Sequence, residues 1–219
     1  MKPLIKSSPI SGIYTDHSAC TAIHDGWSIA EHFGNITNEQ NAFKHSSIIV
    51  DWSHLIKYSF RGNACAALLE PLFVGTTLLS VNECITGDAF ILMKLMDDEF
   101  FLIISDISID DKIKNLDDNQ ATIINESGAQ GCLVLAGPMR QEIWLRSCAT
   151  DCGEDAIVLH HCKPLSVHGI RTIFYRGKDF ELIITPRDST AFLFDALIDV
   201  GSGSQLTPTG VSVFPVRLA

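Results

Sequence analysis

Apolar and polar side chains alternate along residues 55–61, which is the clearest periodic pattern in the chain. Successive side chains of a β-strand point to opposite faces, so the alternation predicts a strand. One of its faces is apolar and the other is largely polar, and the two sets are Ile56, Tyr58 and Phe60 against Leu55, Lys57, Ser59 and Arg61. We therefore expect a strand of a sheet that buries one face and pairs with antiparallel neighbours.

Further strands are predicted wherever short apolar or β-branched runs lie between turn residues. The acidic residues 97–99 separate two such runs, and Gly169 separates another two, so each pair is expected to form a hairpin. The predicted strands span residues 78–85, 91–96, 100–104, 121–124, 132–136, 165–168, 170–175 and 180–185. This spacing favours a fold dominated by antiparallel pairing.

Helices are predicted at four places by capping residues and prolines. Asn63 begins a helix over residues 64–72 that Pro71 helps to end. Residues 110–116 form at most a short helix. Pro138 opens a helix that continues to Ser147, and Asp188 caps one that continues to Val200. Many strands with a few covering helices indicate the α+β fold class.

Composition restricts the function classes. The chain has 219 residues, with 16 basic and 26 acidic side chains and a net charge of −10. This acidity argues against a surface for nucleic acid or an anionic membrane. No apolar run approaches the roughly 20 residues that span a bilayer, and the N-terminus shows no apolar segment typical of a secretory signal. We expect a cytoplasmic protein without nucleic-acid or membrane partners.

The seven cysteines are spread over the whole chain, which suits reduced thiols better than a disulfide framework. Cys148 and Cys152, followed by His160, His161 and Cys162, form the only group that suggests a metal site. Side chains of three adjacent residues point in different directions, so they do not supply the second short-spaced pair of ligands that zinc sites use. We expect no metal site, and read these residues as a loop with incidental thiols.

Four segments carry a family resemblance. Residues 51–62, DWSHLIKYSFRG, resemble the D-x-S-H-x-G-[KR] segment of the glycine-cleavage T-protein superfamily. Residues 132–140, CLVLAGPMR, look like its strand, Gly-Pro turn and helix. Residues 175–186, YRGKDFELIITP, are similar to Y-T-G-E-D-G-F-E-[LI]-x-V-P with one glycine missing, and residues 206–211, LTPTGV, to L-x-P-[CA]-G-L. The order and spacing fit from about Gly26 to the C-terminus.

The resemblance implies an architecture. Members have two packed α+β lobes of mainly antiparallel sheet, with a tetrahydrofolate pocket between them. We expect one such domain over residues 1–219, with approximate lobes 1–118 and 119–219. The Asp- and Asn-rich residues 106–119 would form the crossing between them. Full-length T-proteins continue into a barrel-like C-terminal domain, which this chain is expected to lack.

The resemblance also implies folate-binding residues. Glu181 matches the glutamate whose carboxylate pairs with the pterin edge, and a solvent-facing strand glutamate is the alternative. Tyr175 is expected either to stack on a ligand ring or to be half-buried with a hydrated hydroxyl. Arg217 lies near the family's arginines after the last motif. Tetrahydrofolate is therefore the expected cofactor.

Several positions depart from the family pattern. The catalytic aspartate of the family corresponds to Ala89 or Phe90, and Asp88 is one place off, so it would serve as the catalytic residue only with a shifted backbone. Phe214 stands where an arginine is expected. Residues 105–108, SDIS, replace N-A-[AS]-N. These departures put catalysis in doubt and leave the fold prediction intact.

Asp51 and His54 begin the first motif, and two roles are open for them. They could form a polar cluster at the mouth of a pocket. An Asp-x-Ser-His sequence is more often a local hydrogen-bonded turn that positions the following strand. We favour the turn.

Two functional classes remain. The first is a folate-dependent aminomethyl- or methyltransferase acting on a small methylamine or a carrier-bound aminomethyl group. The second is a non-catalytic subunit, because the chain is also similar to the gamma subunit of heterotetrameric sarcosine oxidase. The implied partners are folate and either a flavoprotein amine oxidase or a carrier protein, and a homodimer is also open.

Overall fold

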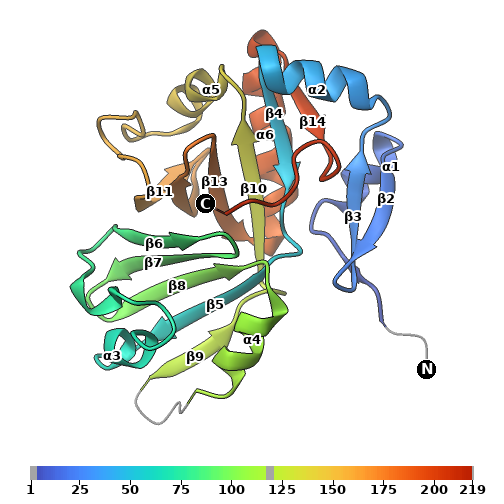
Figure 1. The fold of residues 1–219 in the computed structure, drawn as a ribbon. Helices are drawn as coiled ribbons and strands as arrows, with labels where there is room; N and C mark the ends of the chain where they lie inside the picture. Colours follow the sequence, from blue (N-terminus) through green and yellow to red (C-terminus); the bar gives the residue numbers. More distant parts are fainter. Residues whose placement is uncertain (1–3, 117–120, 219) are drawn as a thin grey trace.

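The computed structural model describes residues 4–116 and 121–218, which form three β-sheets with helices packed on them (Figure 1). The N-terminal sheet has the order β1-β3-β2, with β1 parallel to β3 and β2 antiparallel to it. Its strands are β1 (Lys6–Ser7), β2 (Cys20–His24) and β3 (Trp27–His32), and helix α1 (Ser11–Asp16) lies beside them.

A six-stranded sheet forms the centre of the molecule, in the order β11-β12-β13-β10-β4-β14. All its pairs are antiparallel except β14 with β4. The strands are β4 (Ser47–Asp51), β10 (Gln130–Ala136), β11 (Cys162–Val167), β12 (Ile170–Arg176), β13 (Phe180–Pro186) and β14 (Leu206–Thr209). The helices around it are α2 (Ile36–His45), α5 (Arg140–Ser147) and α6 (Thr190–Gly201).

A five-stranded antiparallel sheet has the order β6-β7-β8-β5-β9. Its strands are β5 (Ile56–Arg61), β6 (Cys84–Gly87), β7 (Phe90–Met96), β8 (Glu99–Ile104) and β9 (Thr122–Asn125). Helices α3 (Cys65–Leu69) and α4 (Ile107–Lys114) cover its outer face. Short 3₁₀ turns at Thr76–Leu78, Arg187–Ser189 and Ser202–Ser204 complete the described elements.

The six-stranded sheet is buried on both faces, and side-chain alternation divides it between two cores. In β10, Cys132, Val134 and Ala136 face the five-stranded and N-terminal sheets. Leu133 and Leu135 face the helices α5 and α6. A strand buried on both faces must be apolar at consecutive positions, which explains the unbroken CLVLA run.

The strand centred on residue 58 is confirmed, and so is its alternation. Tyr58 and Phe60 lie in the outer core with α3, while Lys57 and Ser59 are buried on the opposite face. The α+β class with mainly antiparallel sheets is confirmed as well.

Some predicted elements are wrong in extent. Residues 78–85 contain the end of a 3₁₀ turn and only the start of β6, because Asn82 at positive φ and the turn at residues 80–83 interrupt the apolar run. The helix predicted over 64–72 is limited to α3, and its first cap is Ala64 rather than Asn63. Asp188 lies in the 3₁₀ turn before α6 and does not cap that helix.

Strand pairing crosses residue 118 in both directions. Strand β4 pairs with β10 in the six-stranded sheet, and β9 pairs with β5 in the five-stranded sheet. The six-stranded and five-stranded sheets therefore each contain strands from both sides of residue 118. Residues 117–120 of the predicted crossing lie outside the described residues.

No helix in the described part of the chain has both the length and the hydropathy needed to cross a bilayer. The cysteines in the described part of the chain are all free thiols. Among the same residues, no group of three or more His, Cys, Asp or Glu side chains is arranged to hold a metal ion.

Gly210 follows β14 and packs closely against strand β3 of the N-terminal sheet. A Cβ atom at this position would lie 2.1 Å from the carbonyl carbon and oxygen of Glu31. The Gly210 amide donates to the Glu39 carboxylate at 3.1 Å, and Val211 donates to the Ala30 carbonyl at 3.0 Å. Only glycine permits this close approach of two backbone segments.

We expect Gly210→Ala to lower the free energy of unfolding by about 3 kcal/mol, because the backbone of β3 cannot move aside as a flexible side chain would. Urea unfolding measures the change. Gly128→Ala is the control, since its Cβ would meet no atom within 4 Å. Equal stability of the two variants would contradict the close packing at Gly210.

Candidate functional site

The alternation of β12 and β13 separates the predicted folate residues. Phe180 and Tyr175 face the five-stranded sheet and the C-terminal segment. Glu181 and Arg176 are directly opposed across the two strands and face the helix side. The sheet therefore lies between Glu181 and the rings of Phe180 and Tyr175.

Glu181 is enclosed by two arginines. Its carboxylate is fully buried, and one oxygen accepts a hydrogen bond from Arg140 Nε at 2.8 Å. The other oxygen accepts from Arg176 Nη1 at 2.7 Å. Burial raises the pKa of the Glu181 carboxyl, and the two guanidinium groups oppose that shift. Both oxygens are thus engaged by charged donors within the chain.

The two arginines are fixed by further contacts. Arg176 Nη2 donates to the Cys152 carbonyl at 2.6 Å, and its Nη1 also reaches Gln141 Oε1 at 3.2 Å. Arg140 Nη1 donates to the Gly137 carbonyl at 3.0 Å. The Arg140–Glu181–Arg176 triad therefore ties β12 and β13 to the start of α5 and to the loop at Cys152.

Tyr175 is fully buried, and its hydroxyl lies 3.0 Å from His160 Nδ1. Burial raises the pKa of this hydroxyl. The expectation of a half-buried side chain with a hydrated hydroxyl is wrong, because the loop before β11 covers the ring and His160 takes the place of water. Its ring lies 6.1 Å from that of Phe180.

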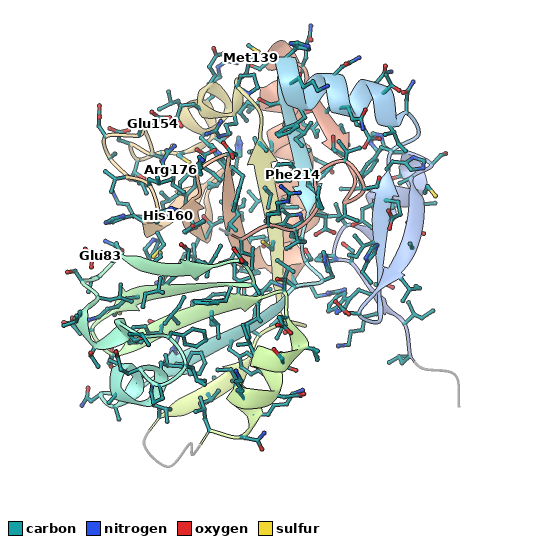
Figure 2. The ribbon with its side chains drawn as sticks, in the orientation of Figure 1. Glu83, Met139, Glu154, His160, Arg176 and Phe214 are labelled. Atoms are coloured by element: carbon teal, nitrogen blue, oxygen red, sulfur yellow. The ribbon has the colours of Figure 1, made fainter. Side chains whose placement is uncertain are left out.

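An aromatic group lies on the same face of the sheet. The Phe214 ring stacks on Trp52 with centroids 5.7 Å apart and planes 13° apart. Phe180 meets Trp52 edge to face at 5.3 Å, and Phe43 meets Phe214 at 5.1 Å. Figure 2 shows Phe214 on the segment that crosses in front of the six-stranded sheet.

A pocket of about 390 Å³ opens beside these rings. Its walls include Phe43, Phe180 and Phe214, and its charged groups are Lys178, Asp179 and Arg217. Arg217 is exposed. The structure thus places Arg217 beside the aromatic group, to which Tyr175 also belongs through its contact with Phe180. Glu181 does not line this pocket.

Asp88 lies on the five-stranded sheet, in the exposed turn between β6 and β7. The neighbouring Ala89 carbonyl accepts a hydrogen bond from the Ser105 amide at 2.9 Å. Phe90 begins β7 and packs on Phe73 at 4.7 Å. Asp88 is therefore not brought to the pocket that Arg217 lines.

The Asp51 turn is held by buried hydrogen bonds. One carboxylate oxygen of Asp51 accepts from Ser53 N at 2.7 Å, which confirms the local turn. The other oxygen accepts from the Ser8 hydroxyl and from Tyr14 Oη, the latter at 2.5 Å. Burial raises the pKa of Tyr14, with a contribution from the Asp51 charge.

Two basic side chains follow, His54 in the same turn and Lys57 at the start of β5. Lys57 is fully buried, and its ammonium donates to the carbonyls of Ser53 at 2.9 Å and Leu55 at 2.8 Å. Burial lowers the pKa of Lys57 to about 8. His54 is buried, and its Nδ1 has no hydrogen-bond partner. Burial lowers the pKa of His54 to about 4, so the imidazole is neutral at neutral pH.

Comparison with known proteins decides the family. Residues 10–217 match the GCVT N-terminal domain. The chain belongs to this family.

Among curated relatives, an aminomethyltransferase of Lysinibacillus sphaericus (strain C3-41) is 25% identical over 235 residues, covering 94% of this chain and 61% of that protein. An aminomethyltransferase of Anoxybacillus flavithermus (strain DSM 21510 / WK1) is 21% identical, covering 95% and 62%. The chain thus spans about three fifths of the length of the curated relatives it matches.

Two solved structures have the same fold. The glycine cleavage system aminomethyltransferase T from Bartonella henselae superposes with a TM-score of 0.80 at 16% identity, covering 95% of this chain and 60% of that one. A chain of the heterotetrameric sarcosine oxidase from Corynebacterium sp. U-96 superposes with a TM-score of 0.63 at 18% identity, covering 77% of this chain and 91% of that one.

Sequence reasoning about this GCVT N-terminal domain missed the partners of its buried carboxylates. In the sequence, Arg140 and Arg176 are residues of two motif segments, and nothing there indicates that they contact Glu181. Strand register and the placement of α5 bring both side chains to its carboxylate. Ser8 and Tyr14, which hold Asp51, precede the region where the family motifs begin. The contacts of Glu181 with Arg140 at the start of α5 and with Arg176 at the end of β12 leave no periodic pattern in the sequence.

We expect Glu181→Gln to lower the free energy of unfolding by about 3 kcal/mol, because the buried Arg176 and the partly buried Arg140 guanidinium groups lose their counter-charge. Chemical denaturation measures the loss. Glu142→Gln is the matched control, since its pair with Arg146 is exposed and should be worth less than about 0.5 kcal/mol. A Glu181→Gln protein as stable as the control would contradict the ion-pair assignment.

Stability should also depend on pH through His54. Its pKa falls from 6.5 to about 4 on folding, so between these values the unfolded chain binds a proton that the folded chain does not. The free energy of unfolding should therefore fall by up to about 3 kcal/mol as the pH drops through this window. Urea unfolding at a series of pH values measures the slope. His54→Gln should flatten it, and an unchanged slope would contradict the assignment.

Proposed function

We propose that this chain is a T-protein-like subunit of one-carbon or methylamine metabolism that acts as a non-catalytic partner of a larger enzyme. The observation that carries the proposal is the complete burial of Glu181 between two arginines. A pterin presents an N–H beside an exocyclic amine, and pairing with it requires a carboxylate edge that the ligand can reach. Here the Glu181 side chain is fully buried, and its oxygens accept from Arg140 at 2.8 Å and Arg176 at 2.7 Å.

Displacing those arginines is costly. A buried charge that loses its partner is destabilised by several kcal/mol. A pterin that took Glu181 would have to compensate this loss at the buried Arg176 and a smaller one at the partly buried Arg140. The triad instead serves as a fixed link between the central sheet and α5.

The catalytic position supports the same proposal. Aminomethyl transfer needs a proton-handling group within hydrogen-bond reach of the folate nitrogen. Ala89 and Phe90 stand where relatives carry that aspartate, and Phe90 packs on Phe73. Asp88 is exposed in the adjacent turn. An aminomethyl- or methyltransferase activity would require this hairpin to rearrange.

The structural comparison supports a choice of partner class. The matched chain of heterotetrameric sarcosine oxidase is covered over 91% of its length, so a fold of this extent occurs as one chain of a larger assembly. A flavoprotein amine oxidase is accordingly the proposed partner. A carrier protein is the alternative partner, because an aminomethyltransferase would need one to deliver its substrate.

A second candidate function is tetrahydrofolate binding without turnover. The pocket of about 390 Å³ beside Phe214 favours it, because aromatic walls suit a planar ring and the cations Lys178 and Arg217 suit the carboxylates of a folate tail. In this mode Phe180 and Tyr175 support the ring, and Glu181 does not contact the ligand.

Calorimetric titration with tetrahydrofolate separates the two candidates. The partner-subunit proposal predicts no micromolar binding and no tetrahydrofolate-dependent turnover of an aminomethylated carrier. It also predicts a complex of defined stoichiometry, measured by sedimentation, when the chain is co-expressed with a flavoprotein amine oxidase. Turnover above the uncatalysed rate would overturn this proposal.

Micromolar binding without turnover would support the second candidate. Arg217→Met should then weaken affinity about tenfold, because a charge-assisted hydrogen bond to a tail carboxylate is lost. Asp155→Asn, an exposed substitution in the loop before β11, is the control. An affinity of the Arg217→Met variant for tetrahydrofolate equal to that of the unmodified chain would exclude this pocket as the folate site.

A further inference from the structure

Two cysteines lie close together in the loop that follows α5. Helix α5 ends at Ser147, and Cys148 after it has an extended backbone, with φ of −99° and ψ of 135°. Its backbone forms a bridge with Val167 of β11. The chain then turns back along the helix, so that the carbonyl of Cys152 accepts from Gln141 Nε2 in the first turn of α5 at 3.5 Å. Both cysteines belong to the same hydrophobic core.

The two side chains are in contact but differ in exposure. The thiol of Cys148 donates a hydrogen bond to the sulfur of Cys152. Cys152 is fully buried, whereas Cys148 is partly exposed. A reagent in solvent therefore reaches this pair at Cys148, and Cys152 can react only through its neighbour.

A guanidinium group lies next to the buried thiol. Arg176 Nη2 donates to the carbonyl of Cys152 itself at 2.6 Å. The hydrogen bond from Cys148 and the charge of Arg176 lower the pKa of Cys152, and burial opposes them. Reactive cysteines lie beside such positive charges, whereas buried thiols without them are inert. The surroundings of this pair therefore favour a thiolate.

A second pair of thiols differs in this respect. Cys84 of β6 and Cys162 of β11 are also in hydrogen-bond contact. Burial raises the pKa of Cys84, so that its thiol remains protonated. A protonated buried thiol is a poor nucleophile. The Cys84–Cys162 pair is therefore an internal comparison for Cys148 and Cys152.

We propose that Cys148 and Cys152 are a redox modification site that closes to an intrachain disulfide by exchange with a small-molecule disulfide. Cys148 passes its proton to the Cys152 thiolate and attacks one sulfur of the small molecule, which breaks the S–S bond and releases a thiolate. That thiolate takes the proton from Cys152. Cys152 then attacks the Cys148 sulfur and expels the second thiolate, which takes a proton from water. The two cysteines lose two electrons, and the small-molecule disulfide gains them.

Closure of the disulfide would join the end of α5 to the loop that holds Arg176. One terminal nitrogen of Arg176 donates to the Cys152 carbonyl, and the other donates to the Glu181 carboxylate. The oxidation state of the two cysteines is therefore coupled to a contact of the Arg140–Glu181–Arg176 triad.

The test equilibrates the reduced, purified chain with glutathione buffers of increasing oxidised fraction, in the absence of folate and of any partner. After acid quenching, the remaining thiols are alkylated in denaturant. Cleavage after Arg146 and Glu154 releases residues 147–154, which contain Cys148 and Cys152 and no other cysteine. Mass spectrometry should find this fragment without alkyl groups and lighter by two hydrogens. The fragments that contain Cys84 and Cys162 should remain fully alkylated.

Variants assign the order of the two steps. Cys152→Ser should stop at the mixed disulfide, so that residues 147–154 carry one glutathione on Cys148. Cys148→Ser should gain no glutathione in this fragment, because Cys152 is buried. Cys84→Ser is the matched control, since it removes one thiol of the other pair, and it should form the Cys148–Cys152 disulfide as the parent chain does.

Three results would overturn the proposal: alkylation of both cysteines after equilibration with oxidised glutathione alone, a Cys84–Cys162 disulfide in place of this one, or glutathione on Cys152 in the Cys148→Ser variant. The parent chain and Cys148→Ser carry the test if Cys152→Ser does not fold. Since neither folate nor a partner protein is present, these outcomes are independent of whether the chain proves to be a partner subunit or a folate-binding protein.

Discussion

The fold depends on a central sheet that is buried on both faces. Strand β10 lies between β13 and β4, and its alternate side chains enter two different cores. Every residue of such a strand loses its solvent, so charged groups are tolerated only at strand ends and only when paired. Glu181 and Arg176 meet this requirement by opposing each other in register and recruiting Arg140 from α5.

This arrangement explains why the predicted folate residues separate. The period of two along β13 puts Phe180 and Glu181 on opposite faces of the sheet. Phe180 joins Trp52 and Phe214 under the C-terminal segment, whereas Glu181 faces α5. A family motif read along the chain keeps the two residues adjacent, but the sheet places them in different environments.

The N-terminal segment contributes more than a covering hairpin. Ser8 and Tyr14 satisfy the buried Asp51 carboxylate, and Glu39 accepts amide hydrogen bonds from Phe33 at 2.6 Å and Gly210 at 3.1 Å. These contacts join the first, middle and last parts of the chain around the Asp51 turn. The same turn contains His54, whose side chain is buried.

The sequence by itself determined the fold class, most strands after residue 55 and membership of the T-protein superfamily, because periodicity and short motifs are local properties. It also marked Asp88, Ala89, Phe90 and Phe214 as departures from the family pattern. It gave no sign that Arg140 and Arg176 hold Glu181, that His160 binds Tyr175, or that His54 lacks a partner. Those relations join residues that strand register and helix packing bring together, so only the tertiary structure decided them.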